Sequence, residues 1–378
     1  MNSGTVIVTG NFELPDKNAA AHRVVNNSKL LRSLGYNAVF LGTNREEPYF
    51  FGIKQREYGA GFDMYEQAYP RSVSQWVSEI FDMKNLKTLV SKYPDTVALM
   101  LYNTQFATVR AARKAFASQG IRILYDCTEW NAYTEGSFVK RAVKSIDSRL
   151  IEHKLPRQCD GIVAVSSVME QEYGGKKPLI VLPPLVDTED TIWKQEIEHR
   201  HRFNFCYAGS PSDKDRLDLL LQAFSALPVG AADLRIIGVT KEEFVSHTPE
   251  ATAFAEHMGI TFTGRLTHYE TVREILSCDC FVFLREPTRR NNAGFPTKFA
   301  EAFTCGVPVI TTAVSDVPAY ADEKCIILPD VSPSGIREAM QNVISRGRSP
   351  SVLRDTFDYT KHTDAFHMWL ERVLCKKD

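Results

Sequence analysis

Short apolar runs alternate with longer segments in which apolar residues recur every three or four positions, along the whole chain. The runs predict β-strands, and the longer segments predict helices, notably 105–118 and 135–155. Another helix is expected from about Asn18, a suitable N-cap, to a stop at Gly35. In the first half the predicted strands are 6–9, 38–42, 97–101, 121–125, 161–165 and 179–182.

The segment 183–202 interrupts this rhythm, because it opens with two prolines and becomes strongly charged. We expect it to mark the boundary between two domains, 1–186 and 187–355. Beyond it the predicted strands are 203–209, 234–238, 260–264, 280–284, 308–312 and 325–329, and the tail 351–374 is predicted to be helical. Strand, helix and strand in succession indicate parallel sheets. The sequence therefore predicts an α/β protein of two doubly wound, Rossmann-like domains that face each other across a cleft, with ligands at the carboxyl ends of the strands.

Composition and charge exclude several classes of protein. Among 378 residues, 45 Lys and Arg against 46 Asp and Glu give a net charge of −1, so no general attraction to nucleic acid is expected. Eight scattered cysteines do not resemble the disulfide framework of a small secreted domain. The N-terminus lacks a signal-peptide pattern, and no apolar stretch of about 20 residues occurs. We expect a cytoplasmic protein.

The most informative stretch is 291–312, between two predicted strands. Pro296 suits the first turn of a helix, so the N–H groups of Thr297 and Lys298 would point out of a helix end that attracts phosphate. Glu301 shares their helix face, where a carboxylate can accept hydrogen bonds from adjacent sugar hydroxyls. The alternative is a capped helix with a solvated glutamate and lysine. Upstream, Gly294 lets the backbone approach a ligand.

This stretch resembles the signature of retaining glycosyltransferases of family 4, which have the GT-B fold. That signature has two glutamates eight positions apart around Gly-Phe, followed by Cys-Gly-x-Pro-Val-Ile. The matching residues are Gly294, Phe295, Glu301, Ala302, Gly306, Pro308, Val309 and Ile310. The position of the first glutamate, which contacts the donor sugar in the family, holds Ala293. The resemblance implies that Glu301 holds the nucleotide ribose, and that the final segment 356–378 packs back on the first domain.

The resemblance extends over nearly the whole chain. Residues 207–224 resemble the start of the family's second domain, where Lys214 falls on the lysine that neutralises the donor diphosphate. The arginine usually found after the glycine, here Gly209, is replaced by Ser210. The residues that would supply the missing charge are Lys298, Arg285, Arg289 and Arg290. Residues 262–270 resemble the loop that receives the nucleobase, with Gly264, Arg265 and Leu266 facing the base. For Lys214 the alternative is a surface lysine near a helix start.

In the first domain, the loop and helix start at 10–23 are expected to meet the diphosphate. The residues concerned are Gly10, Ala20 in a run of small side chains, and Arg23. The alternative is a small-residue helix start packed on the sheet. Asp126 and Glu129, after strand 121–125, are candidate catalytic residues that bind the acceptor or position its hydroxyl, unless they are merely solvated. Asn103 and Thr104 follow strand 97–101 and would face the same cleft.

Residues 138–157 hold six Lys and Arg against two acids, with apolar residues at helical spacing. Such a helix either packs on the sheet or lies on an anionic membrane surface. Neither a GxGxxG after the first strand nor a Walker, HExxH or CxxC motif occurs. In the pattern Asp-Lys-Asp at 213–215, Asp213 is best explained as a helix cap. No metal is predicted.

The resemblance implies a retaining, metal-independent glycosyltransferase that moves a sugar from a nucleotide-diphosphate sugar, a co-substrate, without a further cofactor. The variant of the motif resembles bacterial enzymes of surface polysaccharide synthesis, which implies a saccharide or lipid-linked acceptor and a place in the cytoplasm at the inner face of the membrane. Two alternatives remain. One is a non-catalytic nucleotide-sugar binding protein, and the other is a sugar-nucleotide epimerase or hydrolase of the same fold.

Overall fold

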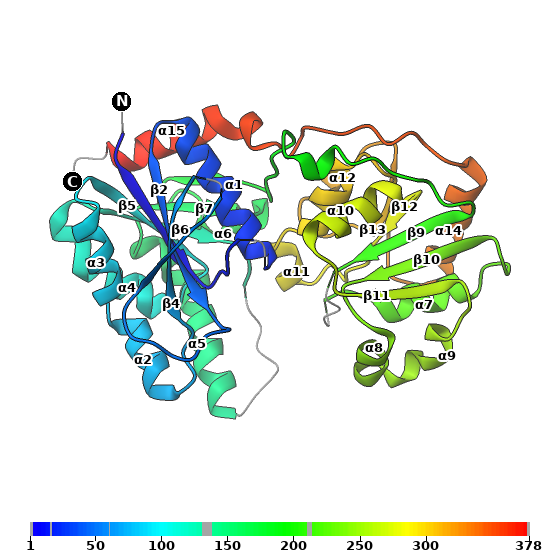
Figure 1. The fold of residues 1–378 in the computed structure, drawn as a ribbon, viewed down its shortest axis with the longest axis horizontal. Helices are drawn as coiled ribbons and strands as arrows, with labels where there is room; N and C mark the ends of the chain where they lie inside the picture. Colours follow the sequence, from blue (N-terminus) through cyan, green and yellow to red (C-terminus); the bar gives the residue numbers. More distant parts are fainter. Residues whose placement is uncertain (1–2, 16, 60, 131–137, 210–213, 376–378) are drawn as a thin grey trace. The chain divides into compact units, whose positions relative to one another are not determined.

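The chain divides into two compact units in a computed structural model that describes residues 3–15, 17–59, 61–130, 138–209 and 214–375. The first unit is Met1–Leu185 with Tyr359–Asp378, and the second is Val186–Asp358. The first boundary lies one residue before the position expected from the sequence. The last helix groups with the first unit (Figure 1).

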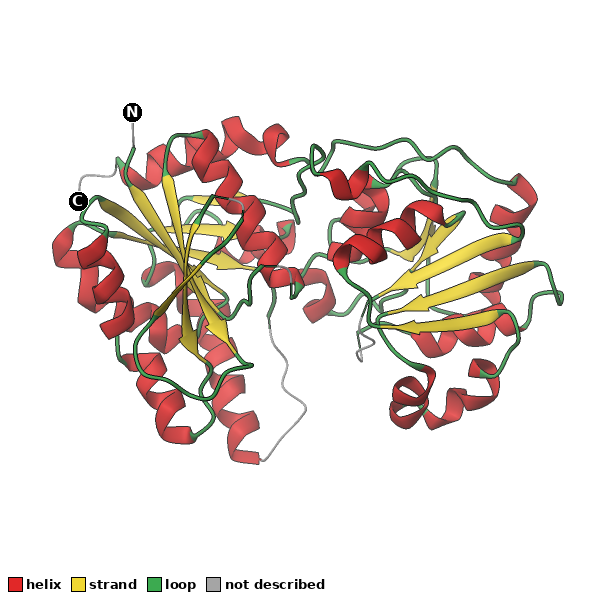
Figure 2. Ribbon diagram, viewed as in Figure 1, coloured by secondary structure: helices red, strands yellow, loops and turns green. Residues whose placement is uncertain are grey.

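The first unit contains an eight-stranded sheet with the order β3-β4-β2-β1-β5-β6-β7-β8 (Figure 2). Neighbouring strands are parallel except for β3, which runs antiparallel to β4 at one edge. The strands are β1 (Thr5–Gly10), β2 (Asn37–Asn44), β3 (Lys54–Arg56), β4 (Asp63–Ala68), β5 (Thr96–Tyr102), β6 (Arg122–Cys127), β7 (Gly161–Ala164) and β8 (Leu179–Val181). The helices are α1 (Ala19–Ser33), α2 (Val73–Phe81), α3 (Lys84–Lys92), α4 (Phe106–Phe116), α5 (Phe138–Lys154), α6 (Ser167–Tyr173) and α15 (Thr363–Leu374).

Helices cover both faces of this sheet. In Figure 1, α1 and α15 lie on one side, and α2, α3, α4 and α5 lie on the other. Asn18 caps α1, since its side chain accepts a hydrogen bond from the N–H of Ala21 at 2.9 Å, and Gly35, with φ of 84°, follows the helix end. Phe366 of α15 is fully buried in the same apolar cluster as Leu30 of α1.

The second unit contains a six-stranded parallel sheet with the order β11-β10-β9-β12-β13-β14. Its strands are β9 (Phe203–Ala208), β10 (Ala232–Ile237), β11 (Ile260–Gly264), β12 (Cys280–Val282), β13 (Val309–Thr312) and β14 (Cys325–Leu328). Its helices are α7 (Leu217–Ser225), α8 (Lys241–His247), α9 (Thr252–Ala255), α10 (His268–Ser277), α11 (Arg289–Ala293), α12 (Thr297–Thr304), α13 (Val317–Tyr320) and α14 (Pro333–Arg346). Two doubly wound sheets of this kind confirm the predicted fold class.

Some elements differ from the sequence-based expectation. The predicted tail helix 351–374 is wrong in its first half, because a 3-10 turn begins only at Tyr359 and α15 begins at Thr363. Phe357, expected on that helix, is fully buried in the second unit instead. The strands β3 and β4 were not predicted, since their sequences KQR and DMYEQA lack an apolar run.

Candidate functional site

The carboxyl ends of β9 and β12 carry a buried ionic cluster centred on Asp215. Asp215 is 7% exposed. Its Oδ1 accepts a hydrogen bond from Nε of Arg285 at 2.6 Å, and its Oδ2 accepts one from the hydroxyl of Tyr207 at 2.8 Å. Lys298, in the first turn of α12, donates from Nζ to the same Oδ2. One carboxylate therefore joins β9, the segment after β12, and α12.

The cluster holds more positive than negative charge. Burial by itself would raise the pKa of Asp215, but the charges of Lys298 and Arg285 outweigh this effect and hold the pKa well below its usual range. Burial lowers the pKa of Lys298, and the attraction of Asp215 opposes that change without cancelling it. Two cations that share one carboxylate leave positive potential for an anionic ligand.

The backbone at the end of β9 passes directly against Lys298. Gly209 has a φ of 140°, and a Cβ at this position would lie 2.6 Å from Nζ of Lys298. A side chain here would have to displace this ammonium group, and the φ of 140° is itself a backbone conformation that favours glycine. Arg285 and Lys298, both predicted as sources of positive charge, lie together in this cluster. Ser210 and Asp213 fall outside the described residues.

The helix α12 begins as the sequence predicts. Pro296 occupies its N-cap position and Thr297 is its first residue. The N–H groups of Thr297 and Lys298 lie in the first turn, so the helix itself offers them no carbonyl acceptor. Glu301 lies on the next turn, with its side chain 21% exposed. The structure thus brings a helix N-terminus, a buried cation and a partly exposed carboxylate together within two turns.

Glu301 also contacts a residue that sequence reasoning missed. Nε2 of His268, the first residue of α10, lies 3.5 Å from Oε1 of Glu301. The ring of His268 packs edge-on against Trp193, with centroids 6.4 Å apart. Because His268 belongs to the stretch 262–270 that resembles the nucleobase loop, this contact places the end of that stretch beside Glu301.

Within that loop, the three predicted residues differ in exposure. Gly264 is buried and has a φ of 70°. A Cβ at this position would lie 3.4 Å from Cγ2 of Thr240. Arg265 is exposed and Leu266 is half-buried. A positive φ at this position favours glycine, and it sets the direction in which the loop leaves β11.

Two residues of the matched signature are core residues. Phe295 is 7% exposed and its ring packs against Phe299, Tyr320 and Phe357. Ala293, at the position of the family's first glutamate, is fully buried at the end of α11. The match to the family's signature predicts Ala293 and Phe295 at the donor site, but both side chains are buried in the second unit. Gly294 has a φ of −81°, an ordinary value that does not require glycine.

The remaining predicted cations lie near these elements. Lys214 is half-buried and directly precedes Asp215. Arg289 is exposed and Arg290 is half-buried, both on the short helix α11. Their predicted contacts with a diphosphate stay predictions.

In the first unit, Arg23 and Asp126 form a buried ion pair. Their side chains are 4% and 1% exposed, and Nη2 of Arg23 lies 2.8 Å from Oδ1 of Asp126. Asn27 donates to Oδ2 of the same carboxylate at 2.9 Å, and Nη1 of Arg23 donates to the backbone oxygen of Leu182 at 3.1 Å. This pair ties α1 to β6 and to the segment after β8. It corrects the expectation that Arg23 meets a diphosphate and that Asp126 meets an acceptor, because neither side chain reaches solvent.

Two other predicted residues of the first unit also have a packing role. A Cβ on Gly10 would lie 2.3 Å from the backbone oxygen of Tyr102, so glycine allows β1 to approach β5 rather than a ligand. Ala20 packs against the apolar core. Glu129 remains half-exposed, in a loop fixed by Asn103, whose Oδ1 accepts from the N–H of Thr128 at 3.0 Å. Thr104 is half-buried.

Among the residues that the structure describes, no group of three or more His, Cys, Asp or Glu side chains is placed to hold a metal ion. The prediction of a metal-independent protein remains a prediction. No helix within the described ranges is long and apolar enough to cross a membrane.

Comparisons with known proteins identify the family that the second unit matches and the fold of the chain. Residues 202–346 match the family of glycosyl transferases group 1. Solved structures of glycosyltransferases match the chain over almost its whole length, so the chain has the fold of the GT-B glycosyltransferases. This result confirms the predicted resemblance, while the assignment to retaining family 4 stays a prediction.

Solved GT-B structures resemble the chain over almost its whole length. Sucrose-phosphate synthase from Thermosynechococcus elongatus has a TM-score of 0.66 at 11% identity, covering 98% of this chain and 99% of that one. HepE from Anabaena, solved with UDP and glucose, has a TM-score of 0.65 at 12% identity, covering 97% and 99%. WaaG, a glycosyltransferase involved in lipopolysaccharide biosynthesis, has a TM-score of 0.59 at 11% identity, covering 98% and 94%. No curated protein matches the sequence.

Proposed function

We propose that this GT-B protein transfers a sugar from a nucleotide-diphosphate sugar to a saccharide or lipid-linked saccharide acceptor, with retention of configuration and without a metal ion. The observation that carries the proposal is the cluster around Asp215. It holds two cations on one carboxylate beside a helix N-terminus, one turn from a partly exposed glutamate. Such a group of charges fits a diphosphate followed by a ribose.

In this proposal each part of the site has one task. Lys298, Arg285 and the first amides of α12 attract the diphosphate, with Lys214 as a further cation. Glu301, held beside His268, accepts hydrogen bonds from the ribose hydroxyls. Negative charge grows on the departing nucleoside diphosphate, and fixed cations stabilise it there.

No side chain is assigned as a nucleophile. The acceptor hydroxyl attacks the anomeric carbon from the side of the leaving group as the bond to the phosphate oxygen breaks. The departing β-phosphate takes the hydroxyl proton, so atoms and charges balance without a covalent enzyme intermediate. The half-exposed Glu129 of the first unit is proposed to position that hydroxyl.

Structural relatives support the class of substrate. HepE was solved with UDP-glucose as well as with UDP and glucose, and WaaG acts in lipopolysaccharide biosynthesis. By analogy we propose a role in the synthesis of a surface polysaccharide, in the cytoplasm at the inner face of the membrane.

The test is turnover with a panel of UDP-, GDP- and ADP-sugars and of saccharide acceptors. Acceptor-dependent release of nucleoside diphosphate, unchanged by a metal chelator, with an α-linked product from an α-linked donor, is the expected result. A product of inverted configuration would contradict the retaining mechanism. Loss of turnover with the chelator would contradict metal independence.

A second candidate is a protein that binds nucleotide sugars without turning them over. It is favoured by Ala293, which is buried where the family has a glutamate on the donor sugar. Tight donor binding in calorimetry without release of nucleoside diphosphate across the panel would establish it. Release without an acceptor would instead indicate a hydrolase, and a changed sugar configuration would indicate an epimerase.

A further inference from the structure

Asn103, directly after β5, has a strained backbone conformation. Its φ is 45°. Within the described residues, only Asn103 and Ser315 combine a positive φ with a side chain other than that of glycine. A side chain makes this left-handed region unfavourable, although asparagine tolerates it better than most residues do. Residues held in rare backbone conformations cluster at active sites and ligand contacts.

The side chain of Asn103 makes two hydrogen bonds to Thr128, directly after β6. Its Oδ1 accepts from the N–H of Thr128 at 3.0 Å, and its Nδ2 donates to the hydroxyl of the same residue. The backbone N–H of Asn103 also donates to the backbone oxygen of Asp126 at 3.0 Å. Glycine at this position would keep only the backbone bond. The positive φ is therefore coupled to two contacts that need an amide side chain.

Thr128 is held from a second side as well. Tyr102, the last residue of β5, is 8% exposed and shares a side-chain hydrogen bond with Thr128. Burial raises the pKa of Tyr102 to about 12, this hydrogen bond partly opposes the rise, and the negative charge of Glu129 adds to it. Glu129 is therefore close enough to act on the phenol. Two consecutive residues, Tyr102 and Asn103, thus fix the residue that directly precedes Glu129.

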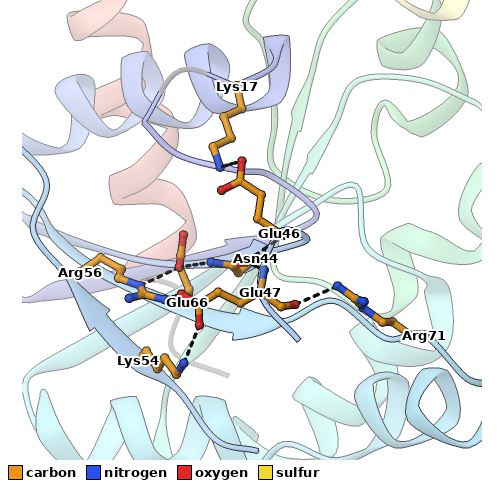
Figure 3. Close-up of polar contacts among 8 residues, drawn as sticks. All are labelled: Lys17, Asn44, Glu46, Glu47, Lys54, Arg56, Glu66 and Arg71. Atoms are coloured by element: carbon orange, nitrogen blue, oxygen red, sulfur yellow. Dashed lines mark hydrogen bonds and ion pairs between the residues drawn. The ribbon is translucent and has the colours of Figure 1, made fainter. Parts of the chain in front are cut away.

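Asn44, at the end of β2, shows that an asparagine can join strand ends without strain (Figure 3). Its Nδ2 donates to Oε2 of Glu66 on β4 at 2.7 Å. Its Oδ1 accepts from the N–H groups of Glu46 and Glu47 at 3.0 and 2.9 Å. Its φ is not positive. The strain at Asn103 is therefore not a general consequence of tying a loop to a neighbouring strand.

The pairing of β5 with β6 does not depend on the contact either, because residues 98–102 already pair in register with residues 122–126. The next residue, Thr104, has a buried hydroxyl oxygen without a hydrogen-bond partner among the described residues. Such a group has a cost in free energy, unless a ligand or a water molecule satisfies it. Ligands of parallel sheets bind at the carboxyl ends of the strands, where Asn103 and Glu129 also lie.

We propose that Asn103 is a positioning residue of the transfer reaction. Its strained backbone aims the amide at Thr128, and this contact fixes the carboxylate of Glu129 for an acceptor hydroxyl. This role rests on the proposed function, in which Glu129 positions that hydroxyl. The hydroxyl must be aligned closely with the anomeric carbon, since a displacement of about 1 Å can lower a rate about 100-fold. Asn103 thus acts on the rate without touching either substrate.

The test is Asn103→Gly in the full chain, because glycine accepts the φ of 45° but lacks the amide. The assay uses the donor and acceptor pair that the turnover panel identifies as active. At saturating donor, kcat should fall at least about tenfold. The affinity for the nucleoside diphosphate of that donor, measured by calorimetry, should stay at the wild-type value. The midpoint of urea unfolding should change little, because relief of the strain offsets the lost hydrogen bonds.

Asn103→Asp is the conservative variant. Aspartate also tolerates a positive φ, and its carboxylate can accept from both the N–H and the hydroxyl of Thr128. Its kcat should therefore lie between that of Asn103→Gly and that of the wild type.

The matched control is Asn37→Gly. Nδ2 of Asn37, the first residue of β2, donates to the hydroxyl of Thr5 on β1 at 3.3 Å, at the amino ends of the strands. The same substitution thus removes an amide contact with a threonine hydroxyl at the opposite end of the same sheet. It should lower the urea midpoint, since no positive φ is relieved there, and it should leave kcat unchanged.

The positioning role is overturned if Asn103→Gly keeps the wild-type kcat, or if Asn37→Gly loses as much. It is also overturned if Asn103→Gly loses nucleotide affinity and stability along with kcat, since a general loss of folding then explains the lower rate. An Asn103→Asp variant no more active than Asn103→Gly would contradict the contacts with Thr128. A wild type without acceptor-dependent turnover would overturn the proposed function together with this role, whereas normal turnover by Asn103→Gly overturns this role alone.

Discussion

Arg285 donates from Nε to Oδ1 of Asp215 across 2.6 Å, while Lys298 occupies the other oxygen of the same carboxylate. The three residues come from the turn before α7, the segment after β12 and the start of α12. Two cations that would repel each other are thus held together by one buried anion. Such an arrangement is costly to break, because each partner depends on the others for compensation of its charge.

Replacing Asp215 with alanine should therefore destabilise the protein strongly. The change leaves the buried Lys298 and the half-buried Arg285 without this counterion, at a cost of about 3–5 kcal/mol in the free energy of unfolding. Urea unfolding followed by circular dichroism measures it. Asp233→Ala is the matched control, since Asp233 pairs with Arg202 on the surface at 3.4 Å and should cost about 0–1 kcal/mol. Equal effects of the two changes would contradict the role given to Asp215.

Glu301→Ala should weaken binding of a nucleoside diphosphate by about 1–3 kcal/mol, the scale of lost hydrogen bonds to a charged group. Isothermal titration calorimetry checks this directly. Glu338→Ala, on an exposed position of α14, serves as the control and should leave the affinity unchanged. Unaltered affinity of the Glu301 variant would remove this residue from the site.

Lys214→Ala should lower turnover more than donor affinity, because charge on the leaving group is larger in the transition state than in the bound donor. Steady-state kinetics that separate kcat from KM give the comparison. Lys241→Ala, which removes a half-exposed lysine paired with Glu256 at 3.1 Å, should change neither parameter. A loss of affinity with an intact maximal rate would show that Lys214 only helps to bind the donor.

The fold was largely predictable because buried parallel strands appear as continuous apolar runs. Every predicted strand is found, with bounds that differ by at most two residues, as for 97–101 against Thr96–Tyr102. The edge strand β3 and its neighbour β4 were not predicted, since polar side chains there leave no such run. The helix predicted for the tail began too early, because the aromatic residues of the tail pack in two different units. Phe357 packs in the second unit and Phe366 in the first.

The sequence predicted the helix of the candidate site, α12, much better than the distant residues that contact it. Lys298 and Glu301 were found because proline, small residues and charge follow one another within a few positions. Asp215 lies 70 residues from Arg285 and 83 from Lys298, so no local pattern shows that they meet. Asp126 was misassigned for a different reason. The predicted strand ends at 125, whereas β6 continues to Cys127, so Asp126 is a buried strand residue and not a loop residue.

Removing Arg23 should show how strongly the first unit relies on its buried pair with Asp126. Arg23→Met leaves the carboxylate buried beside Asn27 alone, and we expect a loss of about 3–5 kcal/mol in the free energy of unfolding. Arg23→Met combined with Asp126→Leu should cost less than the sum of the two single changes, since residues in contact are not additive. Strict additivity in chemical denaturation would contradict the pairing.

Glu79 of α2 gives the protein a pH dependence of its own. Burial raises the pKa of Glu79 from 4.5 to about 7, and the hydrogen bond from Gln67 only partly opposes it. The folded state therefore binds this proton more tightly than the unfolded state. The contribution to stability is present below the usual pKa of 4.5 and is lost as the pH rises through about 7. Glu79→Gln keeps a neutral side chain of the same shape, so it should remove this loss. In urea unfolding the variant should be more stable than the wild type by about 1–3 kcal/mol near pH 8, and no more stable near pH 5. A difference that stays constant across this range would mean that Glu79 does not titrate there, and that its carboxylate is accommodated in the ionised form.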